Sequence, residues 1–130
     1  MHTLPALISA LAVIQFITLS FMVGRARGKY GVMPPATSGP VEFERAYRVQ
    51  QNTLEQLVAF LPSLWLFAYF LQAPQLAALL GGVWLVGRVL YARAYARGQN
   101  RFPGFFATII PTTILILGAL FGILCDLVAL

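Results

Sequence analysis

The feature that most constrains this chain is a succession of four apolar segments separated by short polar connections. The segments occupy about residues 4–23, 41–72, 74–97 and 103–128, and the second is polar in its first third and apolar from residue 57 to 71. A helix needs about 20 predominantly apolar residues to cross the hydrocarbon core of a bilayer, and each segment is long enough to do so. We therefore expect an all-α membrane protein, a four-transmembrane-helix bundle that forms a single domain over residues 1–130.

The composition argues against a soluble domain and against a nucleic-acid-binding protein. Of the 130 residues 59% are hydrophobic and only 10% are charged, which leaves too few charges for the surface of a soluble domain. The net charge of +5 comes from a few charged residues that lie beside long apolar runs, and no nucleic-acid recognition motif accompanies them. With one cysteine, Cys125, and one histidine, His2, the chain lacks the residues for a disulfide framework. We expect no metal site.

The distribution of charge predicts how the bundle is oriented. All nine basic residues lie in or beside the first and third connections: Arg25, Arg27, Lys29, Arg45, Arg48, Arg88, Arg93, Arg97 and Arg101. In a bundle with an even number of spans, these two connections share one membrane face. Cytoplasmic loops carry an excess of Lys and Arg, so this face is predicted to be cytoplasmic and both termini to lie on the other side. The short loops suit a bacterial inner-membrane protein.

Polar residues gather on one side of the second predicted helix, at its basic end. On a helical wheel of about 100° per residue, Arg45, Arg48, Asn52 and Glu55 fall within an arc of about 80°. Gln50 points to a different face, about 140° from Arg45. Four polar groups therefore share one face of this helix over three turns.

A second stripe, on the third predicted helix, contains Arg88, Tyr91 and Tyr95. An unpaired carboxylate near the membrane is costly, so Glu55 is expected to pair with Arg48 or with this second stripe. Two interpretations stay open. The stripes are either helix ties and ordinary interface side chains, or the walls of a pocket for a small zwitterionic or polyanionic ligand. Arginine suits the second role because its planar fork matches a carboxylate.

Three sequence motifs carry a resemblance to a known family. The run E-F-E-R-A-Y-R-V-Q-Q-N-T-L-E at 42–55 resembles the signature of the membrane-associated proteins in eicosanoid and glutathione metabolism, the MAPEG family. The segments P-P-A-T-S-G-P at 34–40 and G-R-V-L-Y-A-R-A-Y at 87–95 also resemble family segments. The resemblance covers nearly the whole chain and favours the branch of microsomal glutathione transferases and leukotriene C4 synthases.

The resemblance implies a homotrimer that binds glutathione, as co-substrate, between adjacent subunits near the cytoplasmic face. The residues that would bind glutathione in one subunit are Arg48, Asn52, Glu55, Arg88, Tyr91 and Tyr95. Gln50, and with a weaker match Arg27, would reach the glutathione of the neighbouring subunit. The family position after the motif glutamate is often tyrosine and is Gln56 here, which leaves the contacts at that point open.

The resemblance also implies a catalytic residue. The thiol-activating arginine at the start of the fourth helix corresponds to Arg101, with Arg97 as a rival because the preceding connection is one residue shorter than in that branch. The implied activity is conjugation of glutathione to a lipophilic electrophile supplied by the membrane, or glutathione peroxidase activity on a lipid hydroperoxide. Such activity is typical of detoxification.

Two other function classes stay open. The first is a non-catalytic lipid- or glutathione-binding protein of the same family, but the member of that kind lacks the thiol-activating arginine that Arg101 would supply. The second is a small transporter subunit. Transporters usually carry charged residues in mid-membrane, whereas the polar stripes here lie at the basic end.

Overall fold

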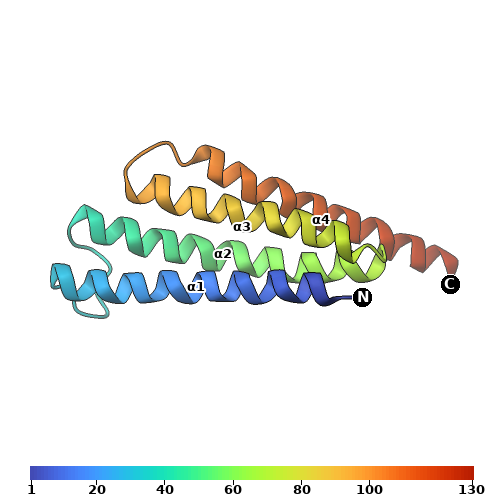
Figure 1. Ribbon diagram of the computed structural model, residues 1–130, viewed down its shortest axis with the longest axis horizontal. Coiled ribbons are helices and arrows are strands. Elements are labelled where there is room, and N and C mark those ends of the chain that lie inside the picture. Colours follow the sequence, from blue (N-terminus) through green and yellow to red (C-terminus); the bar gives the residue numbers. More distant parts are fainter.

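The computed structural model describes all 130 residues and contains four helices and no strand. The helices are α1 (Thr3–Tyr30), α2 (Val41–Phe70), α3 (Pro74–Ala96) and α4 (Phe102–Ala129). They form an elongated bundle with the α1–α2 and α3–α4 connections at one end and both termini at the other (Figure 1). All four are long and apolar enough to cross a membrane. The predicted all-α, four-helix architecture is confirmed.

The first helix is longer than predicted. The expectation that it ends at Val23 is wrong, because α1 continues to Tyr30. The residues after Val23 are polar but include good helix formers such as arginine, alanine and lysine, so the loss of apolar character does not end the helix. Gly31 ends it in the left-handed region at φ 68°, a conformation that glycine adopts without strain. The other helices begin and end within two residues of the predicted positions.

The α2 and α3 helices form the centre of the bundle, since each packs against the other three helices, whereas α1 and α4 do not contact each other. The main core lies along α2, where the ring of Phe60 stacks on Trp84 with centroids 4.2 Å apart. Large apolar side chains such as Phe21, Val58 and Leu117 point outward and are 60 to 73% exposed. An apolar outer surface suits hydrocarbon as the surrounding solvent.

Two glycines bring α3 and α4 close together near the basic end. A Cβ added at Gly104 would lie 2.7 Å from the Cα of Tyr91, and one at Gly87 would lie 2.8 Å from the Cβ of Ala107. Small residues permit such close helix packing in membrane bundles. This contact fixes the start of α4 against the tyrosine-bearing part of α3.

Candidate functional site

Two adjoining cavities open at the basic end, between α2 and the α3–α4 connection. The larger has a volume of about 540 Å³ and is lined by Thr37, Val41, Glu44, Arg45, Tyr47, Arg48, Tyr95, Gly98, Gln99 and Arg101. The smaller, of about 240 Å³, is lined by Arg48, Asn52, Tyr91, Tyr95, Arg101, Phe102 and Phe105. Because the two share Arg48, Tyr95 and Arg101, we treat them together as the basic-end site.

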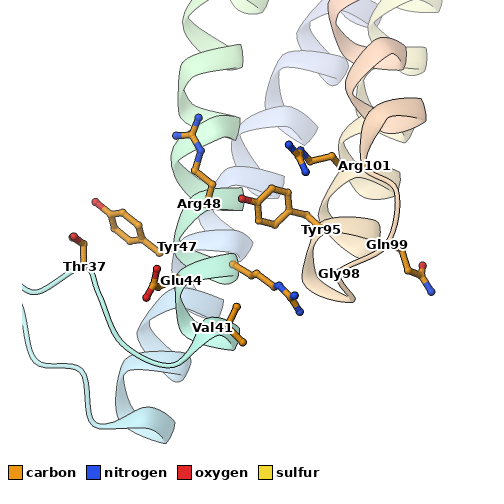
Figure 2. A pocket seen from close by; sticks show the side chains of 10 residues that line it. Thr37, Val41, Glu44, Tyr47, Arg48, Tyr95, Gly98, Gln99 and Arg101 are labelled. Atoms are coloured by element: carbon orange, nitrogen blue, oxygen red, sulfur yellow. The ribbon is translucent and has the colours of Figure 1, made fainter.

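Tyr95 lies between two arginines that come from different helices. Figure 2 shows Arg48 on α2 and Arg101 at the start of α4, with the Tyr95 side chain between them and its hydroxyl toward α2. The guanidinium carbon of Arg101 is 5.4 Å from the centre of the Tyr95 ring and 5.2 Å from that of Phe102. These distances are within the range of cation–π attraction. The aromatic neighbours therefore hold the Arg101 guanidinium at the cavity while leaving its N–H groups available.

The connection that carries Arg101 is shaped by Gly98. This glycine has φ 66°, and a Cβ built on it would lie 2.9 Å from Nη2 of Arg45. The positive φ favours glycine at this position, whereas the flexible end of the Arg45 side chain could move away from a Cβ. The side-chain oxygen of Asn100 accepts a hydrogen bond from the Phe102 N–H at 3.1 Å, which closes the connection onto the first turn of α4.

Glu55 pairs with Arg48, the first of the partners that the sequence suggested. Nη1 of Arg48 lies 3.3 Å from Oε1 of Glu55, and the side chains are 49 and 58% exposed. An ion pair this exposed contributes at most about 1 kcal/mol to stability. Its effect is therefore to orient Arg48 at the edge of the cavities rather than to hold the helices together.

Asn52 supplies an acceptor to the smaller cavity. Its Oδ1 atom is buried and has no hydrogen-bond partner within the chain, and the same is true of Oε1 of Gln56 one turn further along α2. Buried polar atoms in folded proteins nearly always have a partner, often water or a ligand. The Asn52 oxygen is thus free to accept a hydrogen bond from an occupant of the cavity.

The predicted stripe on α3 is divided by the structure. Tyr91 and Tyr95 line the smaller cavity, but Arg88 lines neither part of the basic-end site. Arg88 is only 1% exposed and donates a hydrogen bond of 2.7 Å from Nη2 to Oγ1 of Thr53 on α2. Its guanidinium carbon lies 4.3 Å from the centre of the Tyr91 ring. Arg88 therefore contacts the site through Tyr91.

Gln50 and Arg27 also lie outside the basic-end site of their own chain. Nε2 of Gln50 donates to Oγ of Ser20 on α1 at 3.1 Å, which agrees with its predicted position on another face of α2. Nη1 of Arg27 donates to the carbonyl oxygen of Ala36 at 2.7 Å, and its guanidinium lies 5.1 Å from the centre of the Phe43 ring. Arg27 thus fastens the α1–α2 connection.

The two rival arginines occupy different places. Arg101 lines both parts of the basic-end site, whereas Arg97 lines a separate cavity on the outer face between α1 and α3. No group of three or more His, Cys, Asp or Glu residues comes together anywhere in the chain. Of the two arginines, only Arg101 is positioned to act on an occupant of the basic-end site.

Sequence reasoning missed several residues that line the site. Tyr47 precedes Arg48 directly, and Phe102 and Phe105 follow Arg101 in the first turn of α4. Their position next to predicted site residues is the sequence signal that could have identified them. Thr37 and Gln99 lie in connections, where no periodic pattern indicates which side chains face a cavity.

Comparison with known proteins accounts for these motifs. The family model described as the MAPEG family matches residues 5–121. The chain belongs to the MAPEG family. It is 38% identical over 122 residues to leukotriene C4 synthase of Bos taurus, covering 93% of this chain and 81% of that protein. It is also 38% identical over 119 residues to microsomal glutathione S-transferase 2 of Homo sapiens, covering 90% and 80%.

A further relative comes from a cyanobacterium. An uncharacterized protein of Synechocystis is 55% identical over 124 residues, covering 95% of this chain and 90% of that protein. The family match and the two relatives from Bos taurus and Homo sapiens confirm the resemblance carried by the 42–55 run, including its branch. Family membership and the four membrane-length helices together identify an integral membrane protein.

Proposed function

We propose that this MAPEG protein is a membrane-bound glutathione transferase that binds glutathione in the basic-end site. The observation that carries the proposal is that Arg48 and Arg101 line the same cavities from different helices, with Tyr95 between them. Glutathione has two carboxylates and one amine, so it is anionic and suits a cavity with converging arginines. Relatives named as glutathione S-transferase and leukotriene C4 synthase support the same class of activity.

The chain offers a complementary group for each polar part of glutathione. Arg48 binds a carboxylate through its fork, and Glu55 beside it attracts the ammonium group. The free oxygen of Asn52 accepts a peptide N–H, and the hydroxyl groups of Tyr91 and Tyr95 donate to acceptors deeper in the cavity. These assignments keep the residues implied by the family resemblance.

Three other residues act less directly. Arg88 is a positioning residue, because it contacts the Tyr91 ring from outside the cavity. In a homotrimer, Gln50 and Arg27 face the glutathione of the neighbouring subunit. The trimer is tested by the mass of the purified particle after correction for bound detergent, and a monomeric particle that is fully active contradicts it.

Arg101 has the catalytic role in this proposal. A thiol reacts as a nucleophile only in its thiolate form, and a guanidinium close to the sulfur favours that form and so lowers the thiol pKa. Arg101 is exposed, so the released proton passes to water. The thiolate then attacks the electrophilic carbon, a carbon–sulfur bond forms, and the leaving group departs with the bonding electron pair.

The second substrate reaches the site from the membrane. Phe102 and Phe105 line the smaller cavity beside Arg101, which gives an apolar wall next to the place where the thiolate forms. A lipophilic electrophile dissolved in the bilayer therefore meets the polar co-substrate at the membrane surface. A lipid hydroperoxide is an alternative substrate: the thiolate reduces it to the alcohol, and a second glutathione completes the disulfide.

Orientation and location follow from the basic end. We place that end in the cytoplasm, because Lys and Arg are enriched in cytoplasmic loops, and we place the protein in a bacterial inner membrane. The short loops and the cyanobacterial relative support this location. The test is a single cysteine at Gln99 in a Cys125→Ser background. A membrane-impermeant maleimide should leave this cysteine unlabelled in intact cells. Efficient labelling would show that the basic end faces away from the cytoplasm.

The class of activity is tested by conjugation of glutathione to an aryl halide, using purified protein in detergent. We expect glutathione-dependent release of halide that saturates with glutathione. Binding of glutathione without any turnover on aryl halides, epoxides or hydroperoxides would instead favour the non-catalytic binding protein.

A further inference from the structure

A second cavity, which the proposed reaction does not use, lies on the outer face of the bundle. It runs between α1 and α3 at the basic end, has a volume of about 410 Å³ and shares no lining residue with the basic-end site. We call it the α1–α3 groove. Its apolar wall consists of Leu19, Met22, Val89, Ala92 and Ala96.

The charges in the groove are all positive. Arg88, Arg93 and Arg97 line it and no acidic residue does. Arg93 and Arg97 are one helical turn apart, so their side chains project from the same side of α3. Both are exposed, and neither forms an ion pair, because the only ion pair in the chain joins Arg48 and Glu55. Two neighbouring cations beside an apolar wall favour an occupant that is both anionic and apolar.

The inner end of the groove contains polar groups without partners. Arg88 is 99% buried, and although its Nη2 bonds to Thr53, its Nε and Nη1 atoms have no hydrogen-bond partner. Gln15 donates from Nε2 to the Leu85 carbonyl at 3.2 Å, but its Oε1 atom is also unpartnered. A buried guanidinium with free N–H groups is costly in an apolar environment unless an acceptor reaches it.

The arginines are spaced along the depth of the groove. A helix rises about 1.5 Å per residue, so Arg93 lies about 7.5 Å and Arg97 about 13.5 Å from Arg88 along the axis of α3, toward the basic end. A phospholipid has a matching order of groups: a phosphate at the surface, ester carbonyl oxygens beneath it and an acyl chain below. Basic pockets between transmembrane helices are known to bind anionic head groups.

We propose that the α1–α3 groove binds an anionic phospholipid from the membrane leaflet at the basic end. The phosphate lies between Arg93 and Arg97, the ester oxygens accept hydrogen bonds from the free nitrogens of Arg88, and an acyl chain packs on the apolar wall. The lipid adds packing for α1, the least buried of the four spans. Because Arg88 also contacts Tyr91, the occupant is one side chain away from the basic-end site. Nothing in this binding depends on glutathione.

The test is a competition for lipid measured by native mass spectrometry. Purified protein is mixed with equal amounts of a phosphatidylglycerol and a phosphatidylcholine that carry the same acyl chains. One basic residue near the surface contributes about a five-fold preference for anionic lipid. The wild type should therefore retain phosphatidylglycerol selectively, and the double variant Arg93→Gln/Arg97→Gln should retain about 25-fold less.

A matched control separates the groove from general attraction to positive charge. Arg25→Gln/Lys29→Gln removes two exposed cations at the same end, but neither residue lines the groove; they line a neighbouring hollow that shares only Met22 with it. We expect this variant to retain phosphatidylglycerol within about two-fold of the wild type, since exposed charges outside the binding site are screened by salt. An equal loss in both double variants would overturn the proposal.

A second variant tests the groove without changing any charge. Ala96→Phe fills the exposed edge of the apolar wall and should reduce phosphatidylglycerol retention, whereas Val86→Phe, on an exposed position outside the groove, should not. Thermal unfolding of each variant confirms that it is folded. Retention that Ala96→Phe leaves unchanged contradicts the proposal. The proposal is also contradicted if Arg93→Gln/Arg97→Gln changes the mass of the protein particle but retains as much lipid as the wild type. That result would mean that a second copy of the chain, and not a lipid, covers the groove.

Discussion

Arg97 and Arg101 are four residues apart in the sequence but line different cavities. Arg97 borders the α1–α3 groove, and Arg101 borders the basic-end site beside Tyr95. The separation arises because α3 ends at Ala96 and the left-handed turn at Gly98 redirects the chain before α4 begins. Of the two arginines, the one at the start of α4 is therefore the candidate for thiol activation.

The first prediction concerns turnover. Arg101→Gln should lower kcat for aryl halide conjugation about 100-fold, the usual loss when a group that stabilises developing or bound negative charge is removed. The dissociation constant of glutathione, measured by calorimetry, should change much less. Arg97→Gln, assayed in the same detergent, should keep kcat close to the wild-type value. A large loss of kcat in Arg97→Gln with normal turnover in Arg101→Gln would mean that Arg97, and not Arg101, activates the thiol.

The second prediction concerns glutathione affinity. Arg48→Ala removes a guanidinium that lines both cavities, and a charge-assisted hydrogen bond of this kind is worth about 1.5–3 kcal/mol, so the dissociation constant should rise about 10- to 100-fold. Glu55→Gln should weaken binding to a smaller extent, because it removes the ammonium partner and also the anchor of Arg48. Arg25→Gln is the charge-matched control. If calorimetry shows that Arg48→Ala and Arg25→Gln bind glutathione with equal affinity, the α2 stripe has a structural role only.

The third prediction concerns the contact that fixes the start of α4. Gly104→Ala places a methyl group against the backbone of Tyr91 and should destabilise the fold by about 1–3 kcal/mol, as overpacking of a close contact does. Gly82→Ala is the matched control in α3, since a Cβ there meets nothing within 4 Å. Thermal unfolding in detergent should show a lower Tm only for Gly104→Ala. Equal Tm values for both would mean that α3 and α4 adjust freely.

The fourth prediction concerns the buried arginine. Thr53→Val removes the hydroxyl that accepts the Arg88 hydrogen bond and should cost about 1–3 kcal/mol, because a buried charged donor loses its partner. Thr113→Val is the control, since its exposed hydroxyl bonds only to the Ile109 carbonyl of its own helix. Chemical unfolding in mixed micelles measures both variants. A stability loss for Thr53→Val no larger than that for Thr113→Val would show that Arg88 has another acceptor.

The sequence was sufficient for the architecture and for one wall of the site. Apolar runs identified four helices, and the angular positions of Arg48, Asn52 and Gln50 on α2 correctly separated two faces. The end of α1 was missed because apolar character reports the membrane boundary, whereas the left-handed Gly31 ends the helix.

The main feature of the site that the sequence does not predict is how deeply each helix side chain is buried. Arg88, Tyr91 and Tyr95 share a stripe on α3, but a helical wheel does not show that α2 presents Thr53 to Arg88 and leaves only the tyrosines at the cavity. Thr37 and Gln99 come from connections whose positions depend on packing between helices distant in the sequence. Contacts of this kind follow from tertiary structure alone.

The state of the bound thiol tests the central claim most directly. Wild-type protein and Arg101→Gln, each saturated with glutathione at neutral pH, are compared by the ultraviolet absorbance of the thiolate and by proton release on mixing. We predict that the wild type develops thiolate absorbance with release of a proton and that Arg101→Gln binds glutathione as the thiol. Thiolate absorbance of equal size in the two proteins would contradict the assignment of Arg101 as the group that activates glutathione.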